Sequence, residues 1–113
     1  MRRQMMENAA YEVATQVRAV EESIEAALIE IADLQSKMVH ARVATKAGFA
    51  NTHEAFAQLA AATTGLVTAR GGIAHCHDAL VELRKTIPGL RTVSFGDNEC
   101  PPDEAFGDLR VVA

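Results

Sequence analysis

The sequence contains no tryptophan, and aromatic residues make up only 4% of its 113 residues. Proline, with three residues, and glycine, with seven, are also scarce. The hydrophobic content is nevertheless 49%, and most of it is alanine, valine, leucine and isoleucine. Aliphatic side chains with few helix breakers are typical of packed helices. The length predicts a single domain with one hydrophobic core.

Several classes of protein are disfavoured by what the chain lacks. Its two cysteines, Cys76 and Cys100, have no paired spacing, which indicates a reducing cytoplasm rather than a disulfide scaffold. No apolar run is long enough for a membrane span, and Glu7 and Asn8 interrupt any signal peptide after Arg3. The net charge is −4 and no basic stripe is present. We therefore expect a cytoplasmic chain that binds neither membranes nor nucleic acid.

Two long heptad patterns dominate the sequence. From Met6 to Gly48, apolar or small residues recur at alternating steps of four and three, with no proline between them. This pattern predicts a first helix over about residues 5–47, with Gly48 as its C-terminal stop. Asn51 or Thr52 is then the expected N-cap of a second helix, with Glu54 completing a capping box.

The second pattern runs from Ala55 to Ile87 and stops before Pro88 and Gly89. It predicts a second helix over about residues 52–87. Gly71 and Gly72 lie inside it and cost about 1 kcal/mol each relative to alanine, so a bend or a close helix contact is expected there.

A short connection between two helices favours an antiparallel arrangement. The fold predicted from the sequence is therefore all-α: a long helical hairpin domain over residues 1–89. Folding the chain about residue 50 brings the two apolar seams together and predicts these neighbours: Ile24 with Cys76, Ala27 with Ile73, and Arg70 beside Leu28 over an acidic stretch. In this register Cys76 is buried, whereas His77 lies on a partly exposed flank.

Residues 90–113 form an acidic tail, with two basic and five acidic side chains, rather than a separate domain. Its segments "LRTVSF" and "LRVV" have β-type composition, so an extended or short β-type tail is expected. The tail either docks on the helices through Leu90, Val93, Phe95 and Phe106 or binds another protein.

Apolar residues outside the seams need a cover, because leaving them in water would forfeit several kcal/mol at about 25 cal/mol per Å². Symmetric pairing is the common solution, so we expect a homodimer that forms a four-helix bundle. The candidate interaction surface comprises Phe56, Val67, Ala74, Val81, Phe95 and Phe106.

The stretch "HCHD", residues 75–78, contains only metal-ligand types. Neighbouring residues on a helix point in different directions, and chelation on a helix uses spacings of three or four. Only His75 and Asp78 meet this condition. Metal binding by the bundle is therefore an alternative function that needs ligands from elsewhere.

The segment "HDAL", residues 77–80, resembles the dimerisation and phosphotransfer part of sensor kinases. In that family a histidine followed by an acid lies on a dimeric helical hairpin. The resemblance implies phosphotransfer through His77 or His75. It departs from the family in that His77 lies on the second helix and no glycine-rich nucleotide motif follows.

No catalytic constellation is recognised elsewhere, and no cofactor is indicated. The preferred hypothesis is a non-enzymatic, homodimeric helical protein. It would act as an interaction or assembly module through its apolar helix faces and acidic tail, with itself and another protein as partners.

Overall fold

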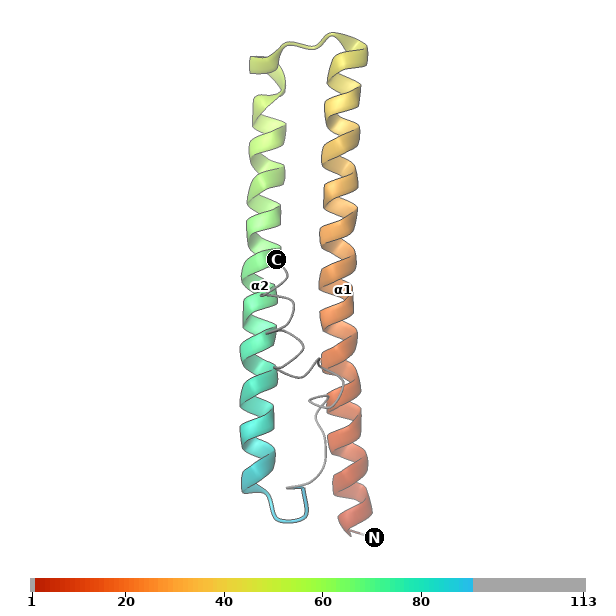
Figure 1. The fold of residues 1–113 in the computed structure, drawn as a ribbon, viewed down its shortest axis with the longest axis vertical. Helices are drawn as coiled ribbons and strands as arrows, with labels where there is room; N and C mark the ends of the chain where they lie inside the picture. The colour runs from red at the N-terminus through yellow and green to blue at the C-terminus, as the bar shows by residue number, and fades with distance from the viewer. Residues whose placement is uncertain (1, 91–113) are drawn as a thin grey trace, which may run out of the picture. The chain divides into compact units, whose positions relative to one another are not determined.

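The computed structural model describes residues 2–90, which fold into two helices, α1 (Arg2–Thr45) and α2 (Phe49–Thr86). Figure 1 shows both helices and the turn that joins them. The predicted all-α helical hairpin is confirmed, while the β-type segments predicted in the tail lie outside the described residues. Neither described helix has the length and apolar character needed to cross a membrane.

The helices contribute to two compact units. The turn unit comprises Val20–Ala74, and the terminal unit contains, among the described residues, 2–19 and 75–90. In the turn unit the two helical segments lie side by side and antiparallel (Figure 1). Ile24 on α1 and Leu59 on α2 are its buried hydrophobic side chains, each 9% exposed.

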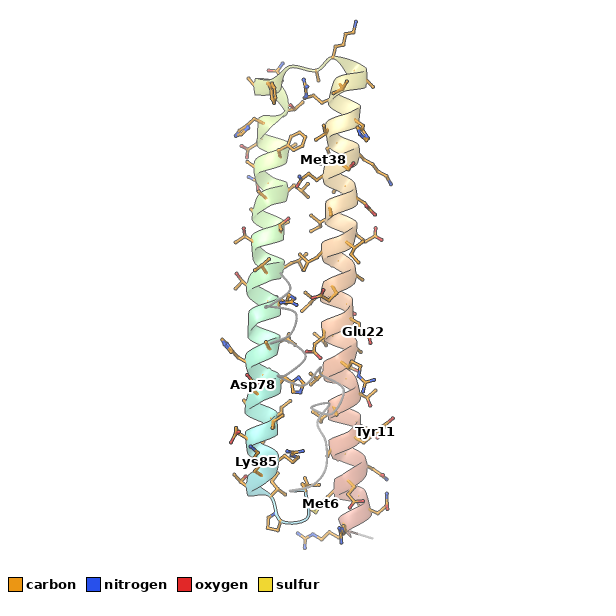
Figure 2. The ribbon with its side chains drawn as sticks, viewed as in Figure 1. Met6, Tyr11, Glu22, Met38, Asp78 and Lys85 are labelled. Carbon is orange, nitrogen blue, oxygen red and sulfur yellow. The ribbon has the colours of Figure 1, made fainter. Side chains whose placement is uncertain are left out.

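The core of the terminal unit is a small cluster of Ala10, Ala14 and Leu90. Four partly buried side chains pack against it: Met6, Leu80, Val81 and Ile87. By contrast, Tyr11 is 69% exposed and points outward from α1 (Figure 2). One face of this part of α1 is therefore buried and another faces solvent.

The turn between the helices is a complete Schellman motif. Lys46 N–H donates to the Val43 carbonyl at 3.3 Å, and Ala47 N–H donates to the Arg42 carbonyl at 3.2 Å. Lys46 has a φ of 57°, the left-handed conformation usual at the first position after a helix. The prediction of Gly48 as the helix stop was therefore wrong, because the chain reverses on a lysine two residues earlier.

Helix α2 also begins earlier than predicted. Thr52 N–H donates to the Gly48 carbonyl at 3.2 Å, which makes Gly48 the N-cap in place of Asn51 or Thr52. The capping box is absent, since the Glu54 carboxylate instead accepts a hydrogen bond from Gln58 at 2.7 Å. The early start of α2 changes the pairing of the helices: Glu25, not Leu28, stands beside Arg70, and Ile24, not Ala27, shares a cavity with Ile73.

Lys46→Gly is expected to raise the free energy of unfolding by about 0.5–1 kcal/mol, because glycine adopts a positive φ without the Cβ penalty. Urea unfolding followed by circular dichroism measures the change at a fixed protein concentration. Lys46→Ala is the matched control, since it removes the charge but keeps the Cβ. An equal gain in both variants would mean that the lysine charge, and not the backbone conformation, sets the effect.

Helix α2 ends in a second turn. Leu90 N–H donates to the Ile87 carbonyl at 3.1 Å, and Gly89 has a φ of 91°. Proline followed by a glycine of positive φ is the signature of a type II turn. The turn places Leu90, 6% exposed, in the terminal-unit core. The predicted docking of Leu90 is confirmed, while Val93, Phe95 and Phe106 lie outside the described residues.

Half of the predicted seam of α2 is confirmed. Every seventh residue from Leu59 to Ile87 is buried or half-buried, as predicted: Leu59, Leu66, Ile73, Leu80 and Ile87. The alternate positions are shifted by one, because Phe56, Thr63, His77 and Arg84 are buried or half-buried where Ala55, Ala62, Cys76 and Leu83 were predicted.

The same shift occurs on α1, where Ala14 is 6% exposed and Val13 is 41% exposed. Residues three and four positions beyond a buried residue lie on opposite sides of it. On α2 the apolar pattern favoured the small residues Ala55, Ala62 and Cys76, whereas the hairpin closes over larger ones. Phe56, Thr63 and His77 fill more of the helix contact.

Gly71 and Gly72 do not interrupt α2, which continues through them to Thr86. A Cβ built on either residue would meet no atom within 4 Å. The close contact expected from the sequence is therefore not made by the described residues, and both glycines face open space.

Candidate interaction surface

The turn unit carries an exposed face made only of uncharged, mostly apolar residues. We call it the apolar flank. Its residues were predicted to lie in the helix contact but lie beside it: Val20, Ala27, Leu34 and Ala41 on α1, and Ala55, Ala62 and Ala69 on α2. Leu34 is 48% exposed. Val20 and Ala27 are half-buried, and the remaining members are exposed.

The two columns of the apolar flank lie on one side of the turn unit. On each helix the column is three residues beyond the buried column, for example Ala27 after Ile24 and Ala62 after Leu59. Antiparallel helices viewed from one end turn in opposite senses. An offset of three residues on each helix therefore places both columns on the same side of the helix contact.

Glycine extends this face on α2. Gly65 and Gly72 lie three residues beyond Ala62 and Ala69, and a Cβ on either glycine would meet nothing within 4 Å. Glycine in a helix interior costs about 1 kcal/mol relative to alanine. Contacts among the described residues give no reason for this cost.

The opposite side of the turn unit carries charged residues. Arg70 Nε forms a salt bridge with Glu25 Oε1, as predicted when Arg70 was placed over the acidic stretch. The hydrogen bond from Arg70 to Glu25, together with the charges of Glu25 and Glu21, raises the pKa of Arg70. Both side chains are more than half exposed, so the pair orients the helices more than it stabilises them.

Beside this salt bridge lies a cavity of about 120 Å³, lined by Glu21, Ile24, Glu25, Arg70, Ile73 and Ala74. One guanidinium and two carboxylates are among the groups that line this small cavity. Arg70 is paired with Glu25 in this cavity, and the charge of Glu21 also acts on it.

The predicted interaction residues are not gathered on the apolar flank. Val67, 55% exposed, and Ala74, also exposed, occupy one column on the side of α2 that carries Arg70. Val81, seven residues further, packs against the terminal-unit core. Phe56 is half-buried near the turn. Phe95 and Phe106 lie outside the described residues.

The residues of "HCHD" lie on different faces of α2. Cys76 is exposed and His77 is 8% exposed, so the predicted burial of Cys76 and partial exposure of His77 were both wrong. The reason is the one-residue shift of the seam, which exchanges their positions. His75 and Asp78 are exposed. A phosphoryl donor would have to reach a histidine nitrogen, which His75 offers more readily than His77.

Within residues 2–90, no three side chains of histidine, cysteine, aspartate or glutamate come together in a way that could hold a metal ion.

A second apolar feature lies beside the turn, and we call it the turn pocket. It has a volume of about 360 Å³ and is lined by Val39, Arg42, Phe49, Thr52, His53 and Phe56. The Arg42 guanidinium lies 4.6 Å from the centre of the Phe49 ring, and its Nη1 donates to the Ala47 carbonyl at 3.2 Å. Sequence reasoning missed this site because it treated Phe49 as part of the connection, although two phenylalanines seven residues apart are a signal in a chain so poor in aromatics.

Comparisons with protein-family models, with curated proteins and with solved structures give no match.

Proposed function

We propose that this protein is a non-enzymatic assembly module whose helical hairpin pairs with a second copy through the apolar flank, giving a four-helix bundle. The observation that carries the proposal is the composition of that face: seven positions on two helices, none of them charged and five of them exposed.

The apolar flank is suited to pairing with itself. Its α1 column offers larger side chains at Val20 and Leu34, whereas its α2 column is entirely alanine with glycine beside it. A two-fold axis parallel to the helices would place α1 of one copy over α2 of the other. The larger side chains would then meet small ones in both halves of the interface, as an isologous contact requires.

The glycines support the same arrangement. Gly65 and Gly72 cost helix stability and have open space where a Cβ would stand. A helix from a second copy could approach α2 closely at such positions. Pairing would therefore give these residues a role that contacts among residues 2–90 do not.

Size-exclusion chromatography with light scattering tests the proposal directly. The expected mass is twice the 12.1 kDa of one chain, and it should fall towards that value on dilution. A mass of one chain at every concentration would rule out the dimer and the function built on it.

A further inference from the structure

The turn pocket shares no residue with the apolar flank, although the two adjoin where Ala41 and Ala55 line a hollow together with Phe56. Its apolar lining is partly open to solvent: Phe49 is 79% exposed and Val39 is 42% exposed, while Phe56 is half-buried. Exposed phenylalanine is unfavourable in water, so the pocket is suited to an apolar side chain from a ligand.

The surroundings of the turn pocket are basic. Residues 36–56 contain Lys37, Arg42 and Lys46 but only one carboxylate, Glu54. Arg42 and His53 line the pocket itself. A guanidinium has five N–H donors, so Arg42 can hold the Ala47 carbonyl and still bind a carboxylate. The matching ligand is an acidic peptide that carries an aromatic side chain.

The chain contains one segment of this chemistry. Residues 96–108 include five carboxylates and no basic residue, and Phe106 lies between Glu104 and Asp108. The sequence elsewhere offers no comparable run of acidic residues around an aromatic one.

We propose that residues 103–108 bind in the turn pocket of the same chain, with the Phe106 ring against Phe49 and Phe56 and the flanking carboxylates paired with Arg42 and His53. The chain leaves the described structure at Leu90, and the 16 residues from there to Phe106 can span about 55 Å when extended. The helix from Phe56 to Thr86 rises about 45 Å, so the connection is long enough. This contact does not depend on the proposed dimer.

A spin label on the tail tests the contact in the full-length chain. With Cys76→Ser, a nitroxide attached to Cys100 is the only label, and paramagnetic broadening of backbone amide signals reports which residues it approaches. Broadening is expected around Val39, Phe49 and His53. The double variant Glu104→Gln/Asp108→Asn should lose it, as should Phe106→Ala and high salt.

The matched control is Asp97→Asn/Glu99→Gln, which removes the same charge outside the proposed segment and should keep the broadening. Broadening spread evenly over the helices, or confined to residues around Ala10 and Ala14, would overturn the proposal. A mixture of ¹⁵N-labelled chains without the nitroxide and unlabelled chains with it distinguishes the source. Broadening of equal strength in that mixture would overturn the same-chain assignment.

Discussion

Leu34→Glu is expected to abolish self-association. Leu34 is the largest exposed residue of the apolar flank, and in the dimer it would lie against alanines of the other copy. Two-fold symmetry buries two such carboxylates without a partner, at a combined cost of about 3 kcal/mol or more. The dissociation constant should therefore rise by about 100-fold or more, as measured by sedimentation or by light scattering over a dilution series.

Ile29→Glu is the matched control, because it makes a similar apolar-to-charged change in the same helix. Ile29 is 64% exposed and does not belong to the apolar flank. Its variant should keep the dissociation constant of the parent. If Ile29→Glu dissociates the protein and Leu34→Glu does not, the pairing face has been misidentified.

The second large effect is expected on stability. Ile24→Ala should lower the free energy of unfolding by about 2–3 kcal/mol, because Ile24 is 9% exposed and faces Ile73 across a cavity that the truncation would enlarge. Urea unfolding followed by circular dichroism at one protein concentration measures the loss.

Ile29→Ala provides the reference for this measurement. It removes the same atoms from the same helix at a position that is 64% exposed, so the change should stay within about 0.5 kcal/mol. Similar losses in the two variants would contradict the assignment of Ile24 to the inner face.

The fold could be predicted because its main signals are local. Apolar spacing over both helices, with no proline between Met1 and Ile87, indicates two long helices, and a short connection leaves few ways to join them. The same pattern identified Leu59, Leu66 and Ile73 as inner residues of α2. These positions follow from periodicity alone.

The side on which the hairpin closes could not be predicted in this way. Beside Leu59, Leu66 and Ile73 on α2 lie a small apolar neighbour and a larger, often polar one, such as Cys76 and His77. Hydrophobicity alone predicts that the small apolar neighbour is buried. The space between two helices must also be filled, and the histidine ring and the aliphatic part of arginine fill more of it. Polar residues at spacings of seven, Thr63, Arg70, His77 and Arg84, were the available signal.

The turn was mispredicted for a different reason. Glycine is the usual residue at a helix end, so Gly48 was preferred, yet Lys46 adopts the positive φ. Tertiary contacts of the turn, including the hydrogen bond from Arg42 to the Ala47 carbonyl, hold the less favourable residue in place. That information depends on three-dimensional contacts and is absent from residue preferences.

The Schellman turn also has a consequence for the order of folding. Contacts of the turn unit are nested about it: Arg42 and the Ala47 carbonyl are five residues apart, whereas Arg70 and Glu25 are 45 apart. Each contact formed near the turn shortens the loop that the next contact, further from the turn, must close. Helix pairing can therefore proceed outward from the turn, one contact after another. Lys46 lies where that process begins. Its strained backbone therefore retards the first step of folding, before the outer pairs of the turn unit have formed.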